Sequence, residues 1–377
     1  MKSTYKSILT AVSLSIMGII QAQYQISDAQ ATQETKNLYS KLLTSMDKGY
    51  FVGHQDDLAY GVYWKAQEGR SDVKDLVKDY PAVYGWEIGD LELGRENNLD
   101  GVPFEKMKDY IKEGYQRGGI ITISWHLANP ITGGNSWDYS NKSIKSILPG
   151  GEHHALFNSY LAKAADFLAD LKDDKGTVIP VVWRPFHEHT GGWFWWGINS
   201  STDEDYKELF RYSVDYLRKD RNLKNLIIGY NTGTEFTSAE QYLKRYPGDE
   251  YVDMVSFDTY QRGSVDGTPE FAKNLDQWMK VLDEVAKDRK KIPAIGEIGY
   301  NQIPHHQWFT EVLTPVFNKY QFSYVLFWRN AGYKAKEQEV EYYLPFKGHP
   351  AAKDFVEFYD SKKTLFEKEA RKLNLYK

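Results

Sequence analysis

Two glutamates, Glu188 and Glu297, are the residues of this chain best suited to chemistry. Glu188 lies in the segment VVWRPFHEHTGGWFWWG, residues 181–197, between two histidines and just before four large aromatic rings. Glu297 lies in the segment IGEIG, residues 295–299. Cleavage of a glycosidic bond needs two carboxyl groups, one protonated to assist the departing oxygen and one ionised to attack or stabilise the sugar cation. The pair therefore indicates this chemistry.

The surroundings of the two glutamates favour different protonation states. The tryptophans of residues 193–196 should desolvate Glu188, and desolvation favours the neutral acid. Glu297 is expected in a glycine-flanked turn that is open to donors, where Arg184 or Tyr260 could hold it ionised. One such glutamate alone could equally form a structural salt bridge, but the pair with its aromatic flanks favours catalysis.

A metal site is the alternative interpretation of the segment His187-Glu188-His189. On a strand, two histidines that are two residues apart would project to one side with the glutamate opposite, and the spacing is not H-E-x-x-H. The pairs 153–154 and 305–306 are further histidines without a third ligand in register, and the chain contains no cysteine. No nucleophile elbow or phosphate loop is present either. The sequence therefore predicts no catalytic metal and no cofactor.

Aromatic residues make up 15% of the chain, with 28 tyrosines and 11 tryptophans. A large fold with many half-buried aromatics is one explanation. The other is a cleft for a sugar, because the apolar faces of pyranose rings pack on tryptophan and tyrosine. Four tryptophans lie at or just beyond the ends of apolar runs, and we predict them to be sugar platforms rather than core residues: Trp125, Trp193, Trp196 and Trp328.

Eight short apolar runs alternate with longer amphipathic stretches, of which residues 154–172 and 203–220 are the clearest helices. Near-continuous apolar runs are typical of strands covered on both faces, so the alternation predicts a (β/α)8 TIM barrel as a single catalytic domain over residues 25–377. A doubly wound open sheet is the alternative, but no G-x-G-x-x-G follows the first run. The runs are 50–55, 81–89, 120–127, 178–188, 225–231, 252–260, 292–300 and 324–330.

The barrel explains how residues far apart in the sequence could meet. Active sites of such barrels lie at the C-terminal ends of the strands. Glu188 and Glu297 close the fourth and seventh runs, so their side chains should converge across the mouth. Two long segments, 88–107 and 128–153, follow the second and third runs and would lie over the cleft. One or both could close one end of the groove, or they could be ordinary surface loops.

Charge and the N-terminus bear on partners and location. The net charge is −5 over 377 residues, which argues against a nucleic-acid or anionic-membrane partner. Residues 1–22 have the features of a secretory signal, with Lys2 and Lys6 before an apolar stretch too short to span a bilayer. Without cysteine there is no acceptor for a lipid anchor. We therefore expect an exported protein, periplasmic or secreted, whose oligomeric state is open.

Several segments together resemble glycoside hydrolase family 26, whose members are mostly β-mannanases. RPFHEHTGGWFWWG resembles the acid/base motif of that family, and IGEIG resembles its nucleophile strand. The likeness runs from about residue 35 to residue 360 and also includes SWHLANP at 124–130, SFDTY at 256–260 and FWRN at 327–330. The segment after the nucleophile, YNQIPHHQW at 300–308, departs from the resemblance.

The resemblance implies a (β/α)8 barrel and hydrolysis with retention of the anomeric configuration. Glu188 would be the acid/base and Glu297 the nucleophile, acting on β-1,4-mannan, galactomannan or mannooligosaccharides. Hydrolysis of β-xylan or mixed-linkage β-glucan on the same scaffold is the alternative, as is a relative that only binds polysaccharide. Whether cleavage is internal or at chain ends stays open. The other residues implied to bind substrate are His126, Arg184, His187, Trp193, Asp258, Tyr260, Trp328 and Arg329.

Overall fold

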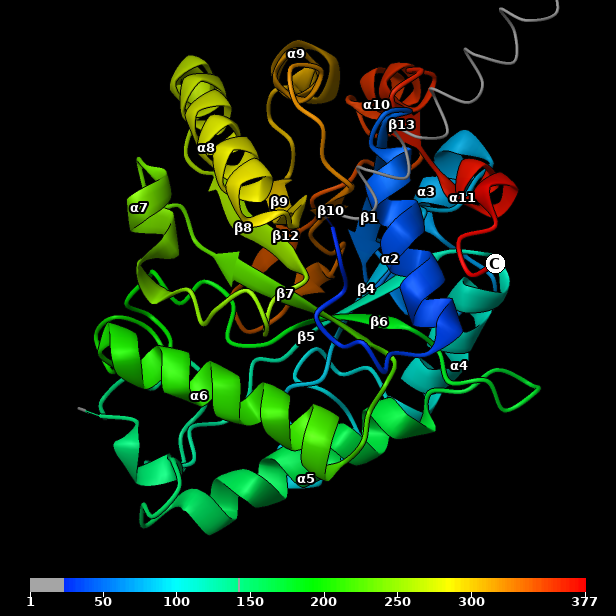
Figure 1. The fold of residues 1–377 in the computed structure, drawn as a ribbon. Coiled ribbons are helices and arrows are strands. Elements are labelled where there is room, and N and C mark those ends of the chain that lie inside the picture. Colours follow the sequence, from blue (N-terminus) through cyan, green and yellow to red (C-terminus); the bar gives the residue numbers. More distant parts are fainter. Residues whose placement is uncertain (1–23, 142) are drawn as a thin grey trace, which may run out of the picture.

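The computed structural model describes residues 24–141 and 143–377, and the predicted signal at 1–22 lies outside them. Eight parallel strands pair in the order β10-β9-β8-β7-β6-β5-β4-β1, and β1 pairs with β10, which closes the barrel (Figure 1). The predicted (β/α)8 barrel is confirmed. Its strands are β1 (Tyr50–Gln55), β4 (Val83–Glu87), β5 (Ile120–Ser124), β6 (Val181–Arg184), β7 (Leu226–Thr232), β8 (Met254–Gln261), β9 (Ile292–Tyr300) and β10 (Tyr324–Phe327).

Helices follow the strands and form the outer layer (Figure 1). The longer ones are α2 (Gln33–Ser45), α4 (Phe104–Gln116), α5 (His154–Asp170), α6 (Asp203–Asp215) and α8 (Thr268–Arg289). The shorter ones are α3 (Asp72–Val77), α7 (Ala239–Tyr242), α9 (Thr314–Phe317), α10 (Ala352–Tyr359) and α11 (Glu367–Leu373). In the described part of the chain, no helix has the length and apolar character needed to cross a membrane.

Helix α6 shows how the local sequence produces this layer. The Thr202 side chain accepts a hydrogen bond from the backbone of Asp205 and caps the helix, and acidic residues in the first turn face the positive end of the helix dipole. Tyr206, Leu209 and Phe210 recur at helical spacing and are buried against the barrel. The helix predicted over 203–220 is confirmed, and its last turn, 216–220, widens into a π-helix.

One end of the barrel interior is apolar. Side chains from the first residues of the strands, among them Phe51, Ile227 and Ile292, pack with Leu38 and Leu42 of α2 in one buried cluster. This floor, defined by that cluster, is closed by α2 at the N-terminal ends of the strands. Four short strands outside the barrel form two small hairpins, β2 (Tyr60–Gly61) with β3 (Trp64–Lys65) and β11 (Gly332–Lys334) with β12 (Glu339–Glu341), and β13 (Thr364–Leu365) pairs with β1.

Candidate active site

A cavity of about 610 Å³ opens at the C-terminal ends of the strands, opposite the floor. We call it the catalytic cleft. Eight of the ten residues that the resemblance implies to act in catalysis or substrate binding line it, while Arg184 lies beneath it and Arg329 lies outside it. Those that line the cleft are His126, His187, Glu188, Trp193, Asp258, Tyr260, Glu297 and Trp328.

A β-bulge in β9 aims Glu297 into the cleft. Asp258 of β8 pairs with Glu297 while Phe257 pairs with Ile295, so Gly296 is an extra residue, and the pairing with β10 shifts at the same place. A Cβ atom on Gly296 would lie 1.9 Å from the Asn231 side-chain oxygen, so residue 296 must be glycine and also faces the interior. The prediction of a turn around Glu297 was wrong, because β9 continues through Tyr300.

Two donors hold the Glu297 carboxylate. Arg184 Nη2 donates to Oε1 at 3.2 Å, and the Tyr260 hydroxyl donates to Oε2 at 2.7 Å. Both partners that the sequence suggested are therefore in contact with it. A carboxylate that accepts from a guanidinium and a phenol is stabilised in its ionised form.

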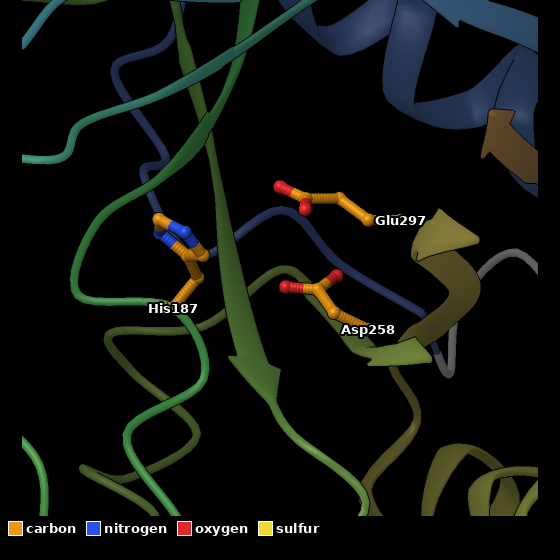
Figure 2. A group of neighbouring side chains, drawn as sticks. All are labelled: His187, Asp258 and Glu297. Carbon is orange, nitrogen blue, oxygen red and sulfur yellow. The ribbon is translucent and has the colours of Figure 1, made fainter. Parts of the chain in front are cut away.

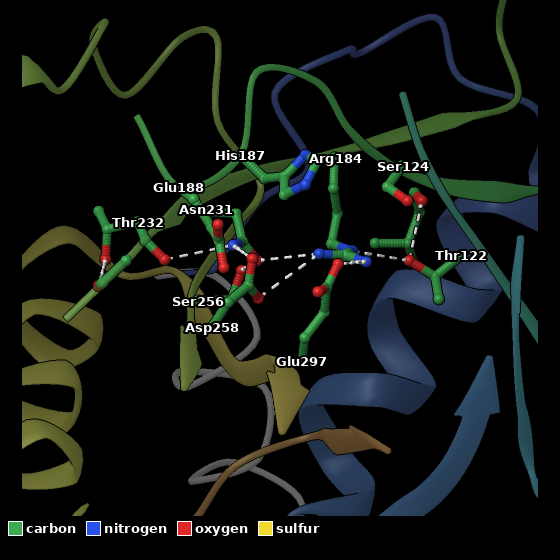
Figure 3. A network of polar contacts seen from close by, with 12 residues as sticks. Thr122, Ser124, Arg184, His187, Glu188, Asn231, Thr232, Ser256, Asp258 and Glu297 are labelled. Atoms are coloured by element: carbon green, nitrogen blue, oxygen red, sulfur yellow. Dashed lines mark hydrogen bonds and ion pairs between the residues drawn. The ribbon is translucent and has the colours of Figure 1, made fainter. Parts of the chain in front are cut away.

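Arg184, the last residue of β6, is the centre of a buried polar network (Figure 3). Its Nη1 donates to Asn231 Oδ1 at 3.3 Å and lies 3.6 Å from Asp258 Oδ1, while Asn231 Nδ2 donates to Asp258 Oδ2 at 2.6 Å. Burial opposes the charge of Arg184, but Glu297 and Asp258 outweigh it and raise the guanidinium pKa. Burial, and then the charge of Glu297, raise the pKa of Asp258 well above its usual value. The network fixes the base of the cleft.

The His187-Glu188-His189 segment lies beyond the end of β6, in a turn. Phe186 and Glu188 both have φ near 51°, a conformation that residues other than glycine rarely adopt. This turn sends His187 and Glu188 toward the cleft and His189 into the core, where its ring lies 4.1 Å from the ring of Tyr206. The predicted strand through residue 188 was therefore wrong, because the ladder to β7 ends at Trp183.

Glu188, like Asp258, is a carboxyl group of the cleft that favours its proton. Burial, followed by the nearby charge of Glu297, raises its pKa to about 7. Trp193 Nε1 donates to Glu188 Oε2 at 2.8 Å and partly opposes this shift. The raised pKa of Glu188 agrees with the prediction that its surroundings favour the neutral acid.

Two histidines stand side by side on the cleft wall. Glu87 accepts from His126 Nδ1 at 2.8 Å, and the Nε2 atoms of His126 and His187 lie 3.1 Å apart. Burial lowers the pKa of His126, but Glu87 outweighs burial and raises it overall. Burial, and then His126, lower the pKa of His187 well below the usual range. The pKa values of the two neighbouring rings are therefore shifted in opposite directions, upward for His126 and downward for His187.

Among the described residues, one group has metal-ligating atoms close enough for a shared ion: His187, Asp258 and Glu297, whose ligand atoms lie within 4.8 Å of one another (Figure 2). The Arg184 guanidinium contacts both carboxylates of this group. A metal ion would have to share them with a buried positive charge, which is unfavourable in a low-dielectric site. The contacts of these carboxylates with Arg184 therefore argue against a shared metal ion at this group.

A half-buried acid and a held carboxylate facing one cleft suit the cleavage of a glycosidic bond. The model of glycosyl hydrolase family 26 matches residues 27–325, most of the chain. The chain belongs to glycosyl hydrolase family 26. The predicted resemblance is confirmed.

Several family 26 proteins are similar to this chain. The structure of a GH26 beta-mannanase from Bacteroides ovatus is 42% identical with a TM-score of 0.87, over 92% of this chain and 98% of that one. A mannan endo-1,4-beta-mannosidase from Bifidobacterium adolescentis is 32% identical over 90% of this chain and 35% of its own length. One from Bacillus subtilis is 29% identical over 61% of this chain and 64% of its own length. This chain thus spans about a third of the length of the Bifidobacterium relative and just under two thirds of the length of the Bacillus relative.

Only part of the predicted aromatic platform is present in this family 26 cleft. Trp193 is 37% exposed and Trp328 is half-buried, and both line the cleft. Trp125 and Trp196 are 1% and 0% exposed, so their prediction as platforms was wrong. Trp125 Nε1 donates to Glu92, and Trp196 Nε1 donates to the His187 carbonyl at 2.8 Å. These two rings support the cleft wall from behind.

A second, larger cavity of about 860 Å³ adjoins the cleft, and Trp137 lines both. Arg329 lines this side cavity and not the cleft. Ion pairs with Asp100 and Glu341 hold it in the side cavity. This position places Arg329 outside the cavity that Glu188 and Glu297 line. Both long loops contribute walls, the first through residues 90–100 and the second through residues 133–137. Both loops therefore line the side cavity, and the second loop also reaches the catalytic cleft through Trp137.

Three functional candidates carry little sequence signal. Trp137 is 48% exposed and stacks on His126 with ring centroids 5.3 Å apart. It lies in the long loop that the sequence placed over the cleft, and that was the only available clue. Glu87 closes the second apolar run but contacts His126 from behind the cleft. Glu235, a fourth carboxylate lining the cleft, lies in a loop without any pattern.

Proposed function

We propose that this family 26 chain hydrolyses β-1,4-mannosidic bonds in mannan, galactomannan or mannooligosaccharides with retention of configuration. The single observation that carries the proposal is the pair of glutamates in one cleft with opposite surroundings. Glu188 is half-buried with a raised pKa, and Glu297 accepts from Arg184 and Tyr260. The substrate class rests on the names of the relatives, which are mannan endo-1,4-beta-mannosidases and a beta-mannanase.

In the first step, a Glu297 oxygen attacks the anomeric carbon while Glu188 gives its proton to the departing oxygen. The bond to the leaving sugar breaks, and a covalent glycosyl-enzyme forms. In the second step, Glu188, now ionised, takes a proton from a water molecule that attacks the same carbon and releases Glu297. Tyr260 and Arg184 keep Glu297 positioned throughout.

The remaining cleft residues bind sugar rings in this scheme. Trp193 is the exposed ring nearest to the acid and offers a flat apolar surface at the cleaved bond. His126 and His187 present imidazole groups to hydroxyls, and Asp258 supports Arg184 beneath them. Trp328 and Arg329 contact sugars farther along the groove. Export to the periplasm or the medium, inferred from residues 1–22, belongs to the same proposal.

A time course of products from linear β-1,4-mannan tests the substrate, with xylan and mixed-linkage glucan alongside. Mannooligosaccharides from mannan are expected, and activity on xylan or glucan alone would overturn the substrate assignment. Proton NMR of the first product tests the stereochemistry, and retention predicts that the β-anomer appears before mutarotation. Cleavage of reducing-end-labelled mannohexaose tests the loops, because scattered internal cuts would exclude a groove closed at one end.

A further inference from the structure

The catalytic cleft contains a fourth carboxylate, Glu235, that the scheme above does not use. It follows β7 in the loop 233–238 and lines the cleft beside Glu188 and Trp193. The Thr190 hydroxyl donates to Glu235 Oε2 at 2.7 Å and accepts from the backbone N–H of Gly233 at 2.9 Å. One carboxylate oxygen is therefore held in place. In the described part of the chain, Oε1 has no hydrogen-bond partner.

The backbone around Glu235 is fixed as firmly as its side chain. The next residue, Phe236, is buried, and its ring packs edge-on against Tyr242 at 5.0 Å. The carboxylate folds back over Gly233, where a Cβ atom would lie 2.4 Å from Glu235 Oε2. Glycine at 233 thus leaves the space that the carboxylate occupies. Such preorganisation lowers the entropy lost when a ligand binds.

The position of Glu235 relates it to the acid and to the leaving side of the cleaved bond. Its hydrogen-bond partner Thr190 is two residues beyond Glu188 in the same turn, and Trp193 from the same segment donates to Glu188. Glu297 lies on β9 and is held by Arg184, the last residue of β6, and by Tyr260 of β8. A sugar whose oxygen is protonated by Glu188 would therefore sit next to the segment that carries Thr190 and Trp193.

We propose that Glu235 accepts hydrogen bonds from hydroxyl groups of the leaving sugar and so selects a sugar, rather than any other group, on that side of the bond. An ionised carboxylate with one held and one free oxygen is suited to this contact, because charge-assisted hydrogen bonds to hydroxyls are stronger than neutral ones. The contact would orient the glycosidic oxygen toward Glu188. This inference rests on the proposed function.

Glu235 also acts on Glu188 through its charge. Its carboxylate is one of the groups that raise the pKa of Glu188, after burial and the charge of Glu297. The other ionisable groups that interact with Glu188 are His126 after β5, and Asp258 and Tyr260 of β8. Removing the Glu235 charge lowers the pKa of Glu188. The activity that requires the protonated acid is then lost at a lower pH than in the wild type.

The first test compares two substrates, mannopentaose and an aryl β-mannobioside, the second of which has no sugar on the leaving side. At about pH 5.5, below the raised pKa of Glu188, Glu235→Ala should lower kcat/KM on mannopentaose by about tenfold or more. The aryl substrate should be cleaved as well as by the wild type. The matched control is Glu240→Ala, an exposed glutamate of α7 outside the cleft, which should leave both substrates unaffected.

The second test is the pH profile of Glu235→Gln, which keeps the shape of the side chain and removes its charge. The alkaline limb of kcat/KM should move to lower pH, and the loss on mannopentaose should be smaller than in Glu235→Ala. A purely structural role of Glu235 would neither shift the alkaline limb of kcat/KM nor make the loss on mannopentaose depend on which variant is used. Equal losses on both substrates, or none on mannopentaose, would overturn the inference while leaving the proposed function intact. Absence of wild-type turnover on mannan would instead overturn the proposed function, and this inference with it.

Discussion

The two ends of the barrel are built from the same strands but differ in chemistry. At the floor, first residues such as Phe51 and Ile292 are apolar and pack on Leu42 of α2. A few residues later, β6 and β9 present Arg184 and Glu297 to the cleft. The floor gains stability from burying apolar surface. The cleft buries charges that must be compensated by one another. Stability and chemistry are thus separated along each strand.

The cleft accepts unfavourable features that the floor does not have. Glu188 is half-buried, its pKa is raised, and its backbone has a positive φ of 51°. Such features persist where the surrounding structure fixes them, and they are typical of functional sites. The comparison predicts that substitutions in the cleft change activity more than stability, and that substitutions in the floor do the reverse.

The largest effect is expected from Glu297→Ala. Loss of the attacking carboxylate should lower kcat on mannan by at least about a thousandfold. Affinity for mannopentaose, measured by calorimetry, should be retained because the aromatic and histidine contacts remain. Turnover close to that of the wild type would exclude Glu297 as the nucleophile. It would also contradict the prediction that substitutions in the cleft change activity more than stability.

Leu42→Ala tests the floor. Leu42 is fully buried, so the cavity left behind should lower the free energy of unfolding by about 2–5 kcal/mol. Chemical denaturation measures this loss, and kcat on mannan at low temperature should stay within about twofold of the wild type because the two ends are far apart. The matched control is Leu156→Ala, a leucine of α5 that is 43% exposed and should cost little. A large loss of kcat without a loss of stability would contradict the separation.

Glu188→Gln sharpens the comparison through pH. The pKa of about 7 in the folded protein lies above the usual value of 4.5, so the folded protein holds a proton that the unfolded chain has released between these values. The free energy of unfolding of the wild type therefore falls as pH rises through this window. The glutamine variant lacks this dependence. Its stability relative to the wild type should increase from about pH 5 to about pH 8, and a constant difference would contradict the raised pKa.

The smallest effect is expected from Trp193→Phe. The variant keeps an aromatic surface but loses the hydrogen bond to Glu188 Oε2, which opposes the rise in the pKa of Glu188. The alkaline limb of kcat/KM should therefore move to higher pH, by less than about one unit. A shift in the opposite direction would mean that exclusion of water by the ring outweighs its hydrogen bond.

The sequence predicted the barrel because its signal, apolar runs alternating with amphipathic helices, is regular along the chain. It placed Glu188 and Glu297 in one cleft for the same reason. Run ends were less certain, since apolar character continues beyond the last ladder hydrogen bond, as at Pro185 and Phe186 after β6. Loop tryptophans were harder still, because whether Trp125 is covered depends on segments that pack on it from elsewhere. Glu235 has no periodic signal at all.

The bulge at Gly296 makes the spacing within β9 as important as its residue types. Side chains of a regular strand alternate between its two faces. Ile295 and Ile298 are three positions apart, yet they pack in the same hydrophobic cluster, which is separate from the floor. Residues 296 and 297 both face inward. Deleting Gly296 would restore regular alternation with every residue type of the site still encoded, yet it would shift the register with two neighbouring strands at once. Anyone transplanting this carboxylate pair into an idealised barrel must therefore also transplant one surplus residue in the seventh strand.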